Sequence, residues 1–122
     1  MAHTRDDRAA TPQAQTAERV RELLVAEGPV REVAMFGTRS FMVRDKLLVG
    51  ALKSGGLLVR VDAERHDELT ARPGAAQAVM GPGRDMGPGW VEVAPGAIAD
   101  DGELEFLLDV ALELNLAAEP RS

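Results

Sequence analysis

The sequence predicts an α+β fold: an antiparallel sheet of about five strands with N-terminal and C-terminal helices packed on it and a short helix between strands. Three observations favour this class. Apolar residues recur at helical spacing near both ends of the chain. Between them lie short apolar segments separated by glycine-containing turns, which is typical of an antiparallel meander. The length of 122 residues suits one compact domain.

The N-terminal part is predicted to be a disordered tail over residues 1–15, followed by a helix over about residues 16–27. The tail has no apolar periodicity and almost no large apolar residues. Thr16 is expected to be the N-cap, and apolar residues at i, i+3 and i+4 from Val20 form the buried face. Gly28-Pro29 ends the helix, because proline cannot continue it.

The middle of the chain is predicted to contain five strands. Each is rich in apolar residues and is bounded by turn residues. Arg44-Asp45 is expected to form the tight turn between the second and third strands. Ser54-Gly55-Gly56 supplies the positive-φ residues of the next hairpin. The predicted strands are residues 31–36, 41–43, 46–52, 57–61 and 90–93.

Between the fourth and fifth strands, the sequence predicts a short helix and a loop. Asp62 is expected to cap a helix over roughly residues 63–71, which Pro73-Gly74 ends. Residues 77–80 are consistent with a short strand or an extended edge. Residues 81–89 are predicted to be a loop, because glycine and proline dominate their composition.

The C-terminal helix is the clearest predicted element. Asp100 and Glu103 have the spacing of a capping box at its start. Glu105, Asp109 and Glu113 are spaced by four residues and therefore form one acidic stripe. The domain is expected to span residues 16–116, with a second disordered tail over residues 117–122. The broad apolar surface comprises Leu104, Phe106, Leu107, Leu108, Val110, Ala111, Leu112 and Leu114, with Asn115 beside them.

The net charge of −6 is confined to the end of the chain. Residues 1–99 contain 13 acidic and 13 basic residues, whereas residues 100–122 contain 7 acidic residues and 1 basic residue. The acidic stripe Glu105, Asp109 and Glu113 is therefore the candidate surface for a protein partner. Residues 39–84 contain 8 basic and 5 acidic residues. Arg39, Arg60 and Arg84 are accordingly the candidate contacts for an anion.

No set of residues predicts catalysis, a metal centre or a cofactor site. The chain has no cysteine, and His3 and His66 are its only histidines, so thiolate and multi-histidine metal sites are excluded. His66 lies among charged residues and is expected to face solvent. The loop over residues 81–89 lacks the Lys-Ser/Thr of a phosphate-binding loop and leads into a strand. The protein is therefore predicted not to be an enzyme and to need no cofactor.

Direct DNA binding and membrane association are disfavoured. The basic excess of residues 39–84 is small, and the four aromatic residues are expected to serve the core. No apolar run approaches the roughly 20 residues that span a bilayer. The N-terminus lacks the apolar segment of a secretory signal, so a cytoplasmic location is expected. The aromatic residues are Phe36, Phe41, Trp90 and Phe106.

A series of short motifs runs in a fixed order through the predicted strands and turns. Its members are Met35-Phe36-Gly37, Phe41-Met42-Val43, residues 46–50, residues 56–61, Ala71-Arg72-Pro73-Gly74, Gly83-Arg84-x-Met86 and Gly89-Trp90-Val91-x-Val93. Over about residues 16–116, this series resembles the TfoX/Sxy N-terminal domain family. Thr38 stands where the family often has a second glycine, and Asp85 stands where it often has proline. The loop before Trp90 is also one residue longer, so both loops are expected to differ in shape.

The resemblance implies an antiparallel sheet with the terminal helices packed on it, in agreement with the predicted elements. It also implies a connection to the regulation of bacterial natural competence, although family regulators carry a second, helical domain and this chain stops at Ser122. It supplies no catalytic residues. The leading prediction is a non-catalytic regulatory or protein-interaction module that acts in transcriptional regulation through a partner. The alternatives left open are a domain that binds a small anionic ligand or nucleotide, and a homodimer formed through a sheet edge.

Overall fold

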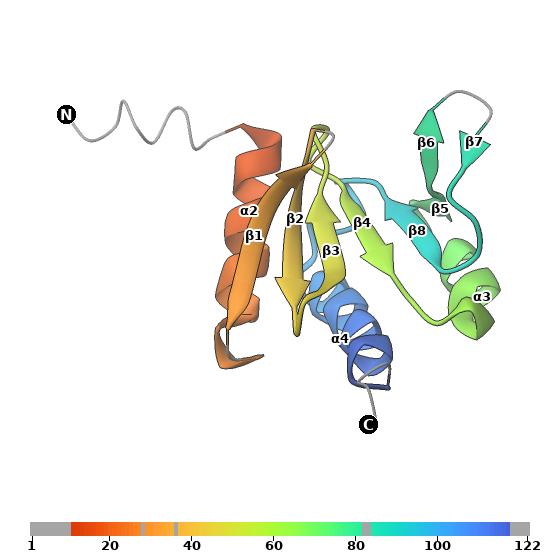
Figure 1. Cartoon of the computed structure of the whole chain (residues 1–122). Helices are drawn as coiled ribbons and strands as arrows, with labels where there is room; N and C mark the ends of the chain where they lie inside the picture. The colour runs from red at the N-terminus through yellow and green to blue at the C-terminus, as the bar shows by residue number, and fades with distance from the viewer. Residues whose placement is uncertain (1–10, 28, 36, 82–83, 118–122) are drawn as a thin grey trace.

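The computed structural model describes residues 11–27, 29–35, 37–81 and 84–117, and it contains a six-stranded antiparallel sheet (Figure 1). The strand order is β1-β2-β3-β4-β8-β5. The predicted α+β class is confirmed. The sheet has one strand more than the five predicted, because β5 pairs with β8. The strands of this sheet are β1 (Val30–Met35), β2 (Thr38–Val43), β3 (Lys46–Ala51), β4 (Leu57–Arg60), β5 (Ala75–Gln77) and β8 (Trp90–Val93).

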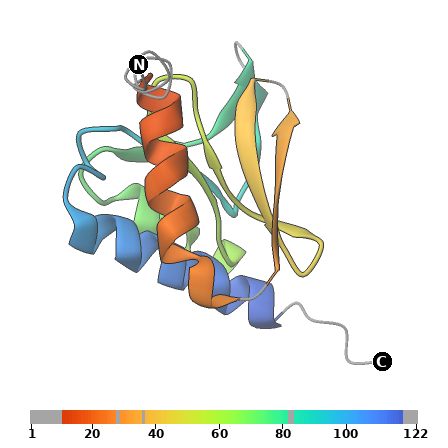
Figure 2. The same cartoon turned by 90° about the vertical axis from the view of Figure 1, so that its left-hand side faces the viewer.

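Two long helices pack on the same face of the sheet, namely α2 (Pro12–Leu23) and α4 (Asp101–Ala117) (Figure 2). The short helix α3 (His66–Thr70) follows the 3₁₀ turn η2 (Ala63–Arg65) and packs against β5 and β8. A second 3₁₀ turn, η1 (Val25–Glu27), follows α2. None of the helices that the structure describes covers the opposite face of the sheet, which faces the viewer in Figure 1.

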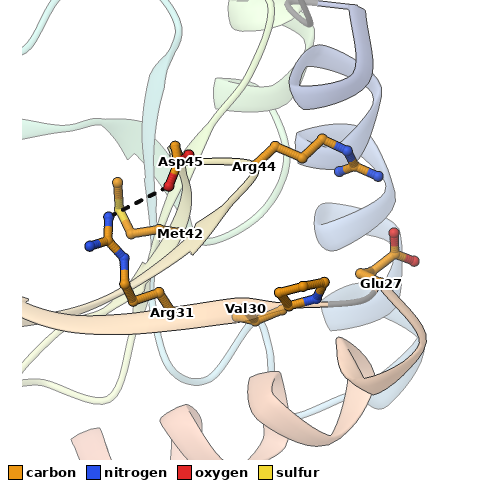
Figure 3. A pocket seen from close by; sticks show the side chains of 7 residues that line it. Glu27, Val30, Arg31, Met42, Arg44 and Asp45 are labelled. Atoms are coloured by element: carbon orange, nitrogen blue, oxygen red, sulfur yellow. Dashed lines mark ion pairs between the residues drawn. The ribbon is translucent and has the colours of Figure 1, made fainter.

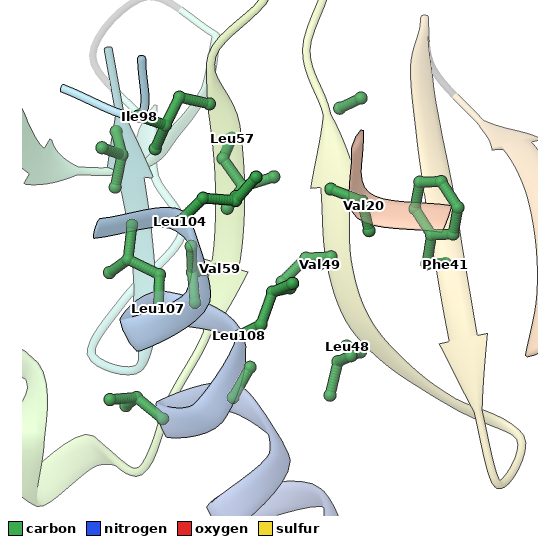
Figure 4. Packing of buried hydrophobic residues seen from close by; sticks show 14 of the residues in the cluster. Val20, Phe41, Leu48, Val49, Leu57, Val59, Ile98, Leu104, Leu107 and Leu108 are labelled. Atoms are coloured by element: carbon green, nitrogen blue, oxygen red, sulfur yellow. The ribbon is translucent and has the colours of Figure 1, made fainter. Parts of the chain in front are cut away.

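The hydrophobic core lies between the sheet and the two long helices. Phe41, Val49, Val59 and Val91 are successive cross-strand partners, and each has an exposed fraction of 0%. They mark the core-facing side of the sheet, because side chains alternate between the two faces along a strand. Val20 of α2 and Leu24 directly after it are buried in this core as predicted, but Leu23, predicted to lie on the same buried face, is 38% exposed. The helix residues labelled in Figure 4 are Val20, Leu104, Leu107 and Leu108.

The turn between β2 and β3 forms as predicted. Arg44 and Asp45 have φ angles of 53° and 64°, which is the left-handed conformation of a two-residue hairpin turn. The buried side chain of Asn115, near the end of α4, attaches to this hairpin. Its amide nitrogen donates to the Val43 carbonyl oxygen at 3.0 Å, and its amide oxygen accepts from Arg44 Nη1 at 2.8 Å. The last turn of α4 therefore fixes the hairpin.

The N-terminal helix begins earlier than predicted. Thr11 is the N-cap, and Pro12 occupies the first helical position, where its missing N–H is not needed. The prediction of Thr16 as N-cap is therefore wrong. Thr16 is buried inside the helix, and its hydroxyl donates to the Gly55 carbonyl oxygen at 2.6 Å. Residues 12–15, predicted to belong to the disordered tail, are helical.

The segment between α3 and β8 contains a further hairpin, part of which lies in the predicted loop. The predicted edge segment, residues 77–80, is divided between β5 and β6 (Val79–Gly81). The predicted loop, residues 81–89, contains β7 (Arg84–Asp85), which pairs with β6. Glycine content alone suggested an irregular loop, but the two glycine-flanked segments pair locally. This hairpin projects beyond the main sheet in Figure 1.

Several predicted features lie outside the described residues. They are the tail over residues 1–10, the helix end at Gly28, the last strand residue Phe36, the loop residues 82–83 and the tail over residues 118–122. Ala117, predicted to start the second tail, is the last residue of α4.

Helix α4 begins where predicted, but its capping box does not close. The Asp100 carboxylate accepts from the Gly102 backbone N–H at 3.3 Å. Glu103, the predicted reciprocal partner, instead accepts two hydrogen bonds from Arg72, at 2.9 and 2.6 Å. The Arg72 guanidinium also stacks over the Phe106 ring, 4.2 Å from its centroid. The Glu103 carboxylate thus binds Arg72, which is 31 positions away, and does not complete the local cap of the helix.

Candidate functional site

The acidic stripe Glu105, Asp109 and Glu113 is exposed on α4. The structure already uses one of its three carboxylates, because Glu113 accepts a hydrogen bond from Arg65 at 2.6 Å. Glu105 and Asp109 form no ion pair or hydrogen bond with another residue in the described ranges. The predicted stripe therefore consists of two unpaired carboxylates and one paired carboxylate.

Two arginines, Arg65 of η2 and Arg72 just after α3, hold α4 on either side of Glu105 and Asp109. Arg65 binds Glu113 and, at 2.9 Å, Glu68. Arg72 forms its two hydrogen bonds with Glu103, and these bonds are the main reason that the pKa of Glu103 is lowered. Because Glu103 and Glu113 are both tied to the rest of the fold, the intervening turns present the unpaired acids on a fixed helix.

The candidate anion contacts Arg39, Arg60 and Arg84 do not come together. Arg39 is two residues before Phe41 and therefore lies on the core-facing side of the sheet, where its Nη1 is 4.0 Å from Glu32. Arg60 directly follows Val59 and extends from the opposite side. Arg84 lies in the projecting β6–β7 hairpin. The structure therefore places the three predicted contacts on two sides of the sheet and on a separate hairpin.

Arg39 is also close to an ion pair that links α2 to the sheet. Glu32 accepts hydrogen bonds from Arg21 Nε and Nη2, at 2.5 and 3.0 Å. These hydrogen bonds are the main reason that the pKa of Glu32 is lowered, with a smaller contribution from the charge of Arg39. The positive charge of Arg39 therefore faces a carboxylate within the fold.

Arg60 lines a cavity of about 220 Å³, where β3 and β4 diverge beyond their last paired residues. Its guanidinium lies over the Trp90 indole, 5.3 Å from the ring centroid. Lys46 is a second cation on the wall, and the described lining contains no carboxylate. The other lining residues are Leu47, Ala111, Leu114 and Asn115. This cavity combines two positive charges with an apolar wall.

A larger hollow of about 440 Å³ lies between the start of β1 and the β2–β3 turn (Figure 3). Arg31 and Asp45 face each other across it, with 3.9 Å between Nη2 and Oδ1. Arg44 points away from this pair toward α4. Glu27 adds another carboxylate to the wall. Charges of both signs line the hollow, so it does not favour an anion or a cation.

The sequence predicts that His66 faces solvent, but the structure shows a different position. It is partly buried, and its Nδ1 accepts a hydrogen bond from the Gly89 backbone N–H at 2.9 Å. Gln77 supports the same loop, donating from Nε2 to the carbonyl oxygens of Ala78 and Gly87, each at 3.0 Å. Sequence reasoning missed both contacts, since each joins residues whose proximity depends on the folded sheet. His66 and Gln77 position the base of the β6–β7 hairpin.

Within the ranges that the structure describes, no group of three or more histidine, aspartate or glutamate side chains is arranged to hold a metal ion. Across the same residues, no helix has the length and apolar character to traverse a bilayer. Among the described residues, the exposed carboxylates of α4 are one surface feature with charge of a single sign, and the cavity beside Arg60 is another.

The fold and its surfaces define a small α+β domain with one antiparallel sheet and two long helices on one face. Residues 22–114 match the TfoX N-terminal domain, and the chain belongs to this family. No curated protein matches the sequence.

A solved structure has a similar fold. It is the crystal structure of a protein from Pseudomonas syringae, a target of the Northeast Structural Genomics Consortium. The two chains share 15% sequence identity and superpose with a TM-score of 0.55, over 80% of this chain and 96% of that chain. At this identity the likeness establishes the fold alone.

Proposed function

We propose that this chain is a non-catalytic protein-interaction module that acts in regulation through a protein partner. The partner docks on the exposed side of α4, through Glu105 and Asp109. The contrast along α4 carries the proposal: the acids at positions 103 and 113 bind arginines of the same chain, whereas the two between them have no such contact among the described residues. A partner surface rich in lysine or arginine would supply the missing charge.

The physics of the helix supports such a partner. Like charges four residues apart repel each other, at a cost of about 0.2–0.5 kcal/mol per pair, and a basic partner would remove this cost. Because α4 is packed on the sheet and held by Arg65 and Arg72, docking would order only the two acidic side chains. Charge complementarity of this kind accelerates association and weakens as salt increases.

The docking surface is tested by a charge reversal with a matched control. The double variant Glu105→Lys/Asp109→Lys is compared with Glu18→Lys/Glu22→Lys, which makes the same charge change on exposed positions of α2. Proteins bound in the native host are quantified by proximity labelling and mass spectrometry. We expect the partner to be lost from the α4 variant and kept by the α2 variant. Equal retention by both would exclude docking on α4, and equal loss would show that net charge alone controls binding.

The regulatory part of the proposal is tested in cells. Transcript levels are compared between a strain that lacks the gene and strains that carry either double variant. We expect Glu105→Lys/Asp109→Lys to reproduce the changes caused by the deletion and Glu18→Lys/Glu22→Lys to match the wild type. A deletion strain without transcript changes would refute a role in transcriptional regulation.

Direct contact with DNA is not part of the proposal. Several cations of the basic middle segment face carboxylates in the fold, including Arg39, Arg65 and Arg72. Their charge is thus partly neutralised before any phosphate approaches.

The second candidate function is the binding of a small anion, and the cavity beside Arg60 favours it. Lys46 and Arg60 both line this cavity, without a carboxylate among the described lining residues. Bound ligand stabilises the native state by RT ln(1 + [L]/Kd), or about 1.4 kcal/mol at ten times Kd. A thermal-shift screen of nucleotides and organic acids should therefore raise the Tm, and Lys46→Gln should abolish the shift while Arg39→Gln keeps it. No shift at millimolar concentrations would exclude this function.

A further inference from the structure

The two edges of the six-stranded sheet are built differently. At one edge, β5 has three residues and packs against α3. At the other edge, β1 has six residues and pairs with β2 in unbroken register, from Val30 opposite Val43 to Met35 opposite Thr38. It contains no proline and no bulge, and no other described strand lies on its free side. A long regular edge of this kind offers a row of N–H and C=O groups to another strand.

Of the two charged side chains of β1, Glu32 is engaged within the fold, whereas Arg31 is 65% exposed beside the exposed Asp45. Glu32, near the middle of β1, is held by Arg21 of α2 on the core-facing side of the sheet. Arg31 lies 3.9 Å from Asp45. Around these residues the edge is apolar: Met35 is 37% exposed, and Val33 is partly exposed on the same face as Met35. The charged residues of β1 therefore protect this edge from pairing with another strand less than its sequence suggests.

Symmetry restricts how two copies of β1 can pair. If both copies keep their helices on the same face of a continuous sheet, a two-fold axis must pass between two copies of the same residue, because side chains alternate in direction. An axis at Arg31 or at Glu32 places like charges directly opposite each other, which is unfavourable. An axis at Ala34 pairs only residues 33–35 of the described strand. An axis at Val33 pairs residues 31–35 without opposing like charges.

We propose that two copies of this chain form a homodimer through antiparallel pairing of β1 with β1, with the two-fold axis at Val33. In this register Val33 faces Val33 of the second copy, Glu32 faces Ala34 and Arg31 faces Met35. The small Ala34 leaves room for the Glu32–Arg21 ion pair on the helix side. On the other side, Val33 and Met35 of both copies form a continuous apolar strip. The dimer involves β1 and leaves α4 free, so it is independent of the docking surface proposed above.

Charge substitutions at the axis test this register. Val33→Lys and Val33→Glu each place like charges opposite each other in the dimer. The monomer should tolerate both substitutions, because the Val33 side chain is only partly buried there. We expect each variant to weaken the dimer by roughly tenfold or more, which light scattering and analytical ultracentrifugation would measure. An equal mixture of the two variants should regain the dimer, because lysine then faces glutamate.

A matched control is Ala76→Lys, at the middle of the β5 edge, where the residue is exposed. It should leave the dimer unchanged. The proposal is overturned if the wild-type chain is monomeric at concentrations near 1 mM, if Ala76→Lys weakens the dimer as much as Val33→Lys, or if folded Val33→Lys and Val33→Glu do not combine.

Amide hydrogen exchange provides a second measurement that needs no variant. With rising protein concentration, alternate amides of β1 should gain protection while those of β5 do not change. Concentration-independent exchange along β1 would also overturn the proposal.

Discussion

Four of the acids of α4 fall into two groups that look alike in sequence and differ in structure. Glu103 and Glu113 bind Arg72 and Arg65, which lie 31 and 48 positions away along the chain. Glu105 and Asp109 lie between them, on the same helix, and have no such contact within the described residues. The helical spacing that groups Glu105, Asp109 and Glu113 into one stripe says nothing about which of them the fold uses. Whether an acid of α4 stabilises the fold depends on whether the rest of the chain places an arginine beside it.

The largest expected effect separates the two sides of α4. Leu104 is fully buried, whereas its neighbour Glu105 is exposed. Leu104→Ala should lower the free energy of unfolding by about 2–5 kcal/mol, because it leaves a cavity between α4 and the sheet. Glu105→Ala should change it by less than about 0.5 kcal/mol. Urea denaturation of both variants measures the difference, and similar values would contradict the assigned orientation of α4.

The core of α4 could be predicted because its apolar residues recur at helical spacing over several turns. Leu104, Leu107, Leu108 and Ala111 are all buried, as expected. The start of α2 could not be placed as well, because Thr11 and Thr16 are both suitable N-caps by residue type. The choice depends on Gly55, whose carbonyl oxygen binds Thr16 inside the fold. Such a contact depends on a distant hairpin and leaves no local signal.

A smaller effect is expected at the end of α4, where Asn115 and Leu116 show an inverted pattern of burial. The polar residue is 3% exposed and the apolar one 54% exposed. Asn115→Ala should cost about 1–3 kcal/mol, because the Val43 carbonyl oxygen loses its donor in a buried setting. Leu116→Ala should be nearly neutral. Thermal unfolding of the two variants checks this order, and a larger loss for Leu116→Ala would contradict it.

Acid should separate the paired from the unpaired carboxylates. The pKa of Glu103 is lowered in the fold, chiefly by its hydrogen bonds from Arg72, and the unfolded chain has the ordinary value. Between these two pKa values the unfolded state binds more protons, so the stability from this pair is present above the ordinary pKa and is lost as pH falls through the lowered one. Glu103→Gln should therefore reduce the pH dependence of unfolding below about pH 5. Denaturation curves between pH 3 and pH 7 measure this, and an unchanged profile would contradict it.

The candidate sites were less predictable than the fold. Arg39 and Arg60 are both strand residues of the basic segment, but they lie on opposite sides of the sheet. Arg39 is two positions from the core-facing Phe41, whereas Arg60 is one position from the core-facing Val59. Arg84 lies in a hairpin whose pairing the glycine-rich sequence hid. Conversely, Lys46 and Arg60 line one cavity because β3 and β4 diverge, a feature of the register that composition cannot show.

The central claim is that the unpaired acids of α4 serve a partner and the paired acids serve the fold. It is tested most directly by measuring both unfolding free energy and partner binding for Glu105→Lys/Asp109→Lys and for Glu103→Gln. We predict that the first variant keeps its stability and loses the partner. The second should lose about 0.5–1 kcal/mol of stability and keep the partner. Full partner binding by Glu105→Lys/Asp109→Lys, with its fold intact, would contradict the claim.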